Sequence, residues 1–458
     1  MPVERGTACE KDRWGWIRSY PLDAAGTRSV PRVQSTPIPT MQTANRARPG
    51  WQRTLYIIFF VQLVTAVGFS SIFPFLPLYI EELGTTTSLS VELLAALVFS
   101  AQAFTMMLAS PFWGSLADRY GRKLMVERAT FGGAVVIVLM AFVTSAEQLV
   151  ALRAIQGLIT GTLAASNAMV AAAVPRARTG YAMGMLQVSL GVGLAVGPLI
   201  GGLAADTFGY SSAFFFTSAL LMLAGILVMF GVREEFEPLL NLTRSPLAFM
   251  KEWRAIVAGK GISLSYGMRF ISQLGRMMVL PITPLFVQQL LVDQSRLNTF
   301  TGLVVAVSAA TLTVAAIYLG RLGDRIGHKR ILVGSMFMAG LLYLPQSLVT
   351  EAWQLLLLMA MVGVAMGGVI PSISTLLARY SHEGSEGAVF GLDNSVRASA
   401  RAVAPLIGAA VALAFGLRAT FLATGVIFLL GALLAGLRLP EPAQQPPEQA
   451  RISSKEPA

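Results

Sequence analysis

Twelve apolar runs, separated by short polar loops, follow one another along most of the chain. A helix that crosses a bilayer needs about 20 mostly apolar residues, and each run reaches that length. The pattern therefore predicts an all-α polytopic membrane protein. The first six runs are 54–79, 91–117, 124–145, 148–173, 180–204 and 212–232. The last six are 261–290, 298–319, 331–350, 353–378, 387–414 and 417–437.

A polar stretch at 233–260 separates the first six runs from the last six. We therefore expect two six-helix bundles, at 54–232 and 261–437, joined by a cytoplasmic linker. The two ends of the chain, 1–53 and 438–458, mix proline with polar residues and are predicted to be disordered cytoplasmic tails.

The first tail lacks the apolar core of a signal peptide, so we expect the first helix to direct the chain to the membrane. Met41 lies shortly before that helix. We hypothesise that translation starts there, and N-terminal peptides from 1–40 would dismiss this hypothesis.

An internal repeat relates the two predicted bundles. Shifting the chain by about 206 or 207 positions superposes four features in the same order. Two parallel halves place a substrate site between them, near the middle of the bilayer, where one half can rock against the other. The paired features are Pro74 and Pro77 with Pro281 and Pro284, the loop at Gly114 with that at Gly320, Gly184 with Gly391, and Gly197 with Ala404.

Composition supports a membrane protein and gives an expected orientation. Hydrophobic residues make up 54% of the chain and charged residues 13%, whereas soluble proteins carry about 25% charged residues. Lysines and arginines gather in the loops on one side of the predicted helices, and the opposite loops carry only Arg296 and Arg418. The positive-inside rule then places both termini in the cytoplasm of an inner membrane. The net charge of +11 does not predict nucleic-acid binding, because no folded basic surface carries it.

The residues that build enzyme sites are scarce. The chain has one cysteine, Cys9, and two histidines, His328 and His382, so a disulfide framework or a Cys/His metal site is not expected. No nucleophile and base pair or phosphate loop occurs in the predicted helices. An embedded enzyme or sensor is a poor alternative, and we expect no cofactor.

The loop that begins at Gly114 closely resembles the signature loop of the major facilitator superfamily, between its second and third helices. Glycines allow close helix approach and a tight reversal, while the cations suit the phosphate layer. The resemblance implies a latch in which Asp118 accepts hydrogen bonds from Arg122 and from the eleventh helix near Glu386, favouring the outward-open state. The alternative is a simple topology anchor. The latch residues are Gly114, Asp118, Arg119, Gly121, Arg122 and Lys123, with Asp324 and Arg325 in the second copy.

The fifth predicted helix carries a glycine pattern that resembles the family's antiporter motif. Small residues let helix backbones approach closely, and a proline removes one backbone donor. The resemblance implies a proton-linked drug exporter rather than an uptake symporter, and general helix packing is the alternative. The motif residues are Gly184, Gly193, Gly197, Pro198 and Gly202.

The fourth predicted helix contains Arg153, which the resemblance places in the family's third motif, and the repeat places Met359 at the equivalent position. An arginine inside a membrane helix costs about 2.5–3.5 kcal/mol on insertion scales, so it should face the interior and have a partner. Glu92 is the candidate partner. The alternative is that both side chains extend to the interface.

Two further helices carry polar side chains along one side each. The seventh has Arg269, Gln273 and Arg276, and the eleventh has Asp393, Arg397 and Arg401. We expect both sets to line the cavity, because exposing them to lipid is costly. Asp393 and Arg397 lie one turn apart and should pair. The pair either exchanges a proton for substrate or only neutralises a buried arginine.

Over residues 54–438 the chain resembles the twelve-helix drug/proton antiporters of the major facilitator superfamily. The resemblance implies a monomeric secondary transporter that exports small amphipathic compounds in exchange for protons. The extra arginines would suit anionic or zwitterionic substrates. The first predicted helix departs from many such antiporters, which carry an acidic residue there, because Gln62 is the only strongly polar side chain within 54–79. A symporter or facilitator for an organic anion or another metabolite is the alternative on the same fold.

Overall fold

The computed structural model describes residues 50–175, 178–234, 259–381 and 386–440. The chain divides into two units, Met1–Ala47 and Arg48–Ala458, and all described residues belong to the second. Most of the predicted tails and linker, together with Met41, lies outside the described residues.

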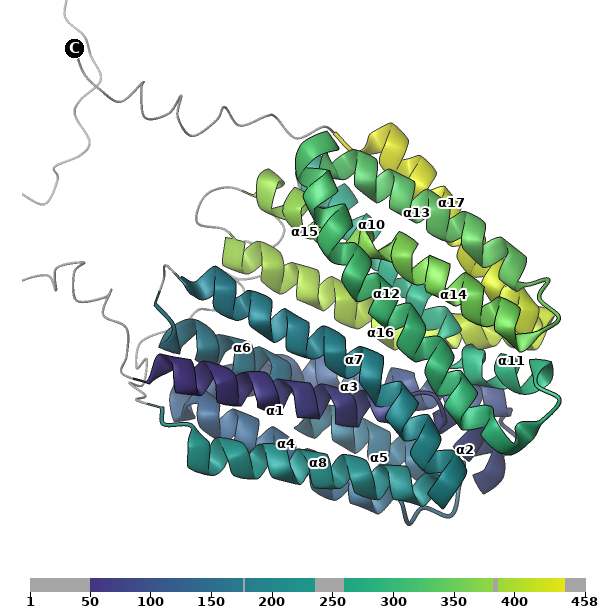
Figure 1. Cartoon of the computed structure of the whole chain (residues 1–458), viewed down its shortest axis with the longest axis horizontal. Helices are drawn as coiled ribbons and strands as arrows, with labels where there is room; N and C mark the ends of the chain where they lie inside the picture. The colour runs from purple at the N-terminus through teal and green to yellow at the C-terminus, as the bar shows by residue number, and fades with distance from the viewer. Residues whose placement is uncertain (1–49, 176–177, 235–258, 382–385, 441–458) are drawn as a thin grey trace, which may run out of the picture. The chain divides into compact units, whose positions relative to one another are not determined.

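The first half consists of eight helices that coincide with the first six apolar runs (Figure 1). The first run forms two helices because Pro74 and Pro77 interrupt it, and the fourth divides at Gly161, whose φ is 151°. The helices are α1 (Trp51–Ser71), α2 (Leu76–Leu83), α3 (Val91–Tyr120), α4 (Arg122–Met140), α5 (Ala146–Ile159), α6 (Thr162–Ala173), α7 (Thr179–Phe208) and α8 (Tyr210–Gly231).

The second half repeats this order. The seventh and tenth runs divide at the equivalent places, after Leu280 and at Gly368. The elements are α10 (Lys260–Val279), α11 (Ile282–Leu290), η4 (Gln294–Arg296), α12 (Leu297–Ile326), α13 (His328–Gln346), α14 (Ala352–Gly367), α15 (Val369–Tyr380), α16 (Glu386–Phe415) and α17 (Leu417–Arg438).

The predicted all-α membrane class is confirmed. By length and hydropathy, eight helices of the described part can cross a membrane, or nine if the bent pair α10 and α11 counts as one. Three predicted runs fall outside that count: α4 and α13 begin with basic residues, and α5 and α6 are individually short. The internal repeat supports these three runs as spans, because each lies at the same position in its half as an equivalent run in the other half.

Equivalent helix contacts recur in the two halves. A side chain at Gly157 would overlap Thr105, and one at Gly363 would overlap Thr311, 206 positions further along each helix. The same holds for Gly201 against Ser71 and Gly408 against Met278, with a shift of 207. The repeat seen in the sequence is therefore also a repeat of helix packing.

The loops lie at two ends of the helices, which we name the basic face and the opposite face (Figure 1). The basic face carries the turns at Gly121 and Gly327, and the opposite face carries those at Gly84, Gly209 and Gly416. The halves meet where α7 packs on α12 and where α3 packs on α16. Those two seams bound the space in which a substrate site is expected.

The seam between α7 and α12 is closed towards the opposite face and open towards the basic face. Gly202, Gly191 and Gly184 lie on one side of α7, because spacings of 11 and 7 residues each complete whole helical turns. A Cβ at Gly202 would overlap the Asn298 carbonyl, and one at Gly191 would lie 2.8 Å from Thr313. A Cβ at Gly184 would meet nothing within 4 Å. The two helices thus separate as they approach the basic face.

Hydrogen bonds between the halves show the same asymmetry. Among the described residues, those that join the halves all lie at the opposite face. Gln288 of α11 donates to Glu81 of α2 at 3.0 Å, and Asp206 of α7 accepts from the start of α12. The contacts between the halves are therefore tight at the opposite face and looser at the basic face.

Candidate functional site

A buried ion network connects α10 and α16. Asp393, 2% exposed, receives Arg269 Nε on Oδ1 at 2.8 Å, and Arg397 Nη2 lies 2.7 Å from its Oδ2. Arg269 also donates to Ser374 Oγ at 2.7 Å. The predicted pairing of Asp393 with Arg397 is present. The structure adds Arg269 as a second cation, so one carboxylate lies between two guanidinium groups.

Three further polar side chains lie beside this network, near the middle of the same two spans. Arg276 and Arg401 are half-buried and within electrostatic range of each other and of Arg397. Neither forms a hydrogen bond or an ion pair with the described residues. Gln273 is buried, and its Nε2 also has no partner there. The two guanidinium groups and Gln273 Nε2 are donors without a partner among the described residues, so the cluster can bind a ligand rich in acceptor oxygens.

Arg153 is fully buried in α5, and its partners are two glutamines. Its Nη1 donates to Gln102 Oε1 at 3.0 Å and to Gln156 Oε1 at 2.9 Å. The predicted partner Glu92 is wrong: it lies in the first turn of α3 and forms no ion pair with the described residues. The interfacial alternative also fails for Arg153, because its side chain is 0% exposed. Its Nε and Nη2 have no partner among the described residues.

The predicted latch loop connects α3 to α4 through Gly121, whose φ is 97°. The Glu234 carboxylate caps α4, accepting from the Arg122 amide at 3.1 Å and the Lys123 amide at 2.7 Å. The Arg122 side chain donates to the Ala168 carbonyl at 3.1 Å. The side chain of Asp118 and residues 382–385 lie outside what the structure describes, so the latch remains a prediction.

Other members of the predicted latch do not make contacts between the halves. Gly114 has open space where a side chain would begin, so it is not at a close helix contact in this state. Asp324, in the second copy, pairs with His328 of its own loop at 3.1 Å. Arg119 and Arg325 are exposed at the basic face.

The antiporter-motif residues on α7 contact two different helices. A Cβ at Gly193 or Gly197 would overlap α1, within the same half, whereas one at Gly202 would overlap α12 of the other half. Pro198 lies inside the continuous helix, and its carbonyl is approached by Gly302 of α12. Gly184 faces open space. The motif therefore brings α7 close to both neighbours at the closed end.

A family model described as Major Facilitator Superfamily matches this chain twice, over residues 58–290 and 265–457. The chain belongs to the Major Facilitator Superfamily. The "Multidrug resistance protein MdtG" of Enterobacter lignolyticus is 36% identical over 390 residues, which are 85% of this chain and 93% of that protein. The protein of the same name from Yersinia enterocolitica is 36% identical over 407 residues, which are 88% of this chain and 98% of that protein.

Solved structures share the fold at low sequence identity. The "Bacterial Homolog to Human Lysosomal Transporter, Spinster", in an inward-facing, unoccupied conformation, superposes with a TM-score of 0.72 at 15% identity. The match covers 86% of this chain and 98% of that one. The likeness supports the major facilitator arrangement of two helix bundles.

One cluster of this major facilitator protein was not predicted from its sequence. The Arg128 guanidinium of α4 stacks 3.4 Å from the centre of the Trp113 ring on α3. The Trp113 indole N–H donates to the Leu158 carbonyl at 2.6 Å, next to the break between α5 and α6. We name these contacts of Arg128, Trp113 and Leu158 the clasp. The repeat places Leu319 and Gly334 at the positions equivalent to Trp113 and Arg128, so only the first half has the clasp.

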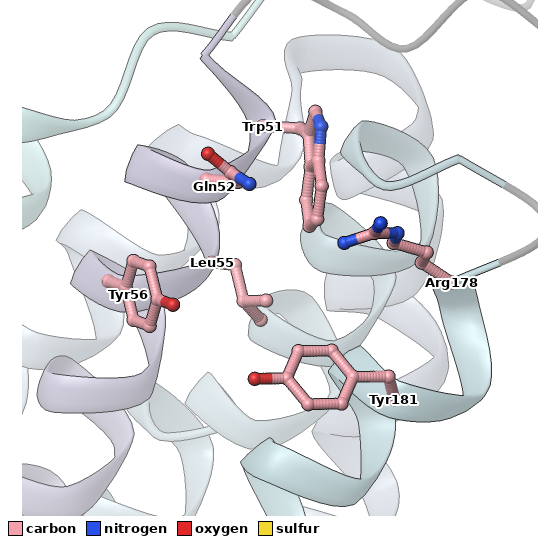
Figure 2. Close-up of a pocket in the computed structure, with 6 residues that line it drawn as sticks. All are labelled: Trp51, Gln52, Leu55, Tyr56, Arg178 and Tyr181. Carbon is pink, nitrogen blue, oxygen red and sulfur yellow. The ribbon is translucent and has the colours of Figure 1, made fainter.

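A groove of about 310 Å³ opens at the basic-face ends of α1 and α7 (Figure 2). The Arg178 guanidinium lies 5.8 Å from the Trp51 ring centre, above two tyrosines. Such aromatic and basic side chains are typical of a membrane–water interface. The groove is separate from the arginine cluster of α10 and α16. Its lining residues are Trp51, Gln52, Leu55, Tyr56, Arg178 and Tyr181.

Two carboxylates at the opposite face accept hydrogen bonds from backbone amides. Glu147 accepts from the Thr86 and Thr87 amides at 3.0 and 3.1 Å. Hydrogen bonds from its own amide and from the Thr87 hydroxyl lower the pKa of Glu147 to about 2. Asp293 accepts from the Ser295 amide and hydroxyl at 2.9 Å each, which lowers the pKa of Asp293. Among the described residues, no group of three or more His, Cys, Asp or Glu side chains could hold a metal ion.

Proposed function

We propose that the chain is a proton-coupled exporter of small amphipathic compounds, working by alternating access. The observation that carries this function is the cluster of unpaired donors, Gln273, Arg276 and Arg401, beside the Asp393 network at mid-span. Membrane interiors exclude unpaired charges unless these face a cavity or serve function. The MdtG multidrug resistance proteins, at 36% identity over most of both chains, support the export of drugs.

The donor cluster favours substrates with an anionic or zwitterionic group. Two guanidinium groups and one amide N–H present donors, and Asp393, the carboxylate beside them in the described part of the chain, already binds two arginines. A substrate carboxylate or similar acid can receive these donors in charge-assisted hydrogen bonds. A cation would meet the repulsion of three net positive charges, since Arg269, Arg276, Arg397 and Arg401 face one Asp393.

Proton coupling requires a titratable group that can exchange protons with one side of the membrane in one state and with the other side in the other state. Asp393 is our first candidate, because releasing Arg397 from it would supply another donor to an anionic substrate. Glu92 and Asp118 are the next candidates. A purely structural role for Asp393 is the alternative.

Asp118 is proposed to hold the basic face closed in the outward-open state. In that state the last turn of α3 would approach the start of α16 at Glu386. Asp118→Asn should impair transport while the protein still inserts normally, because the cations of the loop remain. A loss of inserted protein that equals the loss of transport would instead support a topology anchor.

The positive-inside rule supports an orientation with the basic face in the cytoplasm and both termini on that side. In that orientation, contacts that are tight at the opposite face support an inward-open state, in which export would begin with binding from the cytoplasm. A symporter or facilitator for an organic anion would use the same cluster in the reverse direction.

Substrate-panel accumulation in a strain without its own efflux pumps tests this function. Expression should lower the cellular level of amphipathic acids more than that of matched neutral esters, and a protonophore should abolish the difference. Substrate-dependent uptake with alkalinisation of the medium would favour the symporter. No change for any compound would contradict transport of this substrate class.

A further inference from the structure

Asp206 joins the two halves at the opposite face. Its Oδ1 accepts from the Asn298 amide at 3.1 Å and from Asn298 Nδ2 at 2.8 Å. Its Oδ2 accepts from the Thr299 amide at 2.7 Å. The carboxylate of one half therefore caps the first turn of α12, which belongs to the other half.

The position of Asp206 is unfavourable within its own helix. It lies in the last turn of α7, where the helix dipole presents partial negative charge. The start of α12 presents partial positive charge and free amides, so the favourable interaction comes only from the other half. These hydrogen bonds require contact between α7 and α12, so separating the two helices at the opposite face would break them.

Only one of the two seams between the halves carries this carboxylate. In the repeat, the position equivalent to Asp206 is Leu413, near the end of α16. The position equivalent to Asn298 is Glu92, in the first turn of α3. Duplication alone therefore does not account for Asp206. A contact made in one state and absent from the other biases the equilibrium between the states.

We propose that Asp206 is a positioning residue that holds the opposite face closed, acting as a latch between α7 and α12 in the inward-open state. It acts through the amides of Asn298 and Thr299 rather than by touching substrate. The proposed Asp118 latch would be its counterpart at the basic face, because Asp118 lies near the end of α3 and α16 begins at Glu386. The two would stabilise opposite states of the alternating-access cycle, on which this proposal rests.

Distances between the halves test the latch without any transport assay. Cys9→Ser removes the native cysteine. Spin labels at Ser88→Cys and Leu348→Cys report the opposite face, and labels at Ala171→Cys and Ala378→Cys report the basic face; all four positions are exposed. Double electron–electron resonance is recorded for the full chain in lipid nanodiscs without substrate.

Asp206→Asn should raise the ratio of opposite-face-open to opposite-face-closed molecules by about tenfold, as expected for the loss of one charge-assisted hydrogen bond. The basic-face labels should move closer together in the same molecules. Asp293→Asn is the matched control, because that carboxylate bonds only within its own loop among the described residues. Unchanged distances in Asp206→Asn, or an equal shift in Asp293→Asn, would overturn the proposal.

If Asp206→Asn fails to insert, Asn298→Ala provides the second test. It removes one side-chain donor and leaves both backbone amides in place. A smaller shift in the same direction supports the latch, and no shift overturns it. The distance measurements use no substrate, so their result does not depend on whether the protein exports any compound. A failure of export would refute the proposed function and leave the test of the latch valid.

Discussion

Asp393 and Arg269, which lie 124 positions apart in the chain, form a buried ion pair with 2.8 Å between Oδ1 and Nε. Arg397 completes the network from one turn further along α16. One carboxylate therefore binds two cations, and its removal affects both helices. The network therefore connects α10 to α16, and it is also a candidate for proton exchange.

Asp393→Asn should destabilise the protein by about 3–5 kcal/mol, because it leaves two guanidinium groups without a counter-charge. The measurement is thermal unfolding of the detergent-solubilised protein, followed by fluorescence. Asp393→Asn combined with Arg269→Met should recover much of the loss. A destabilisation that persists unchanged in the double variant would contradict this account of the pair.

The same double variant separates coupling from packing. If Asp393 exchanges protons, the recovered protein should bind substrate but lose its dependence on the proton gradient. Normal turnover that remains protonophore-sensitive would assign coupling to another group, with Glu92 and Asp118 next.

Arg276→Gln and Arg401→Gln should weaken the binding of anionic substrates with little effect on stability. Each removes a charged donor that has no partner in the described part of the chain. A hydrogen bond to a charged group is worth about 1.5–3 kcal/mol, or about ten- to a hundredfold in affinity. Binding is measured by fluorescence quenching with an acid and its neutral ester. Arg438→Gln, at the exposed end of α17, is the control, and equal losses in all three variants would refute the assignment.

Leucine at two glycines on the same side of α7 should shift the conformational equilibrium in opposite directions. Gly202→Leu overfills the closed contact with Asn298, at a cost of about 1–3 kcal/mol, and should open the opposite face. Gly184→Leu fits the open space of this state but should hinder closure of the basic face. Distances between spin labels on the two halves measure both shifts. The same shift in both variants would show that α7 and α12 do not rock about this seam.

Trp113→Phe should lower thermal stability by about 0.5–1.5 kcal/mol, because it removes the donor to Leu158 while keeping a ring beneath Arg128. Trp353→Phe is the matched control, since that exposed tryptophan lies in the second half and its indole forms no hydrogen bond with the described residues. Equal unfolding temperatures for the two variants would indicate that the clasp does not support the break between α5 and α6.

Much of the fold was predictable from the sequence because apolar run length and the internal repeat are local signals. The helix breaks near Pro74 and Gly161 were missed, although proline and glycine mark them, because the apolar pattern continues through both breaks. The Asp393 and Arg397 pair follows from a spacing of four residues on one helix.

Contacts between distant segments could not be predicted in the same way. Arg269 reaches Asp393, and Asp206 reaches Thr299, across helix pairs whose rotation is set by packing of the whole bundle. Charge and depth in the sequence favour Glu92 as the partner of Arg153. The structure supplies Gln102 and Gln156 instead, and only Gln156, three residues along the same helix, carried a local signal.

The central claim, proton-coupled export, is tested most directly by uptake into everted membrane vesicles from a strain without its own efflux pumps. With the vesicle interior acidified, an amphipathic fluorescent acid should accumulate in vesicles that contain the protein, and a protonophore should release it. Vesicles carrying Arg276→Gln with Arg401→Gln should accumulate at least about tenfold less. Accumulation in right-side-out vesicles driven by an inward proton gradient, with none in everted vesicles, would contradict export and establish symport.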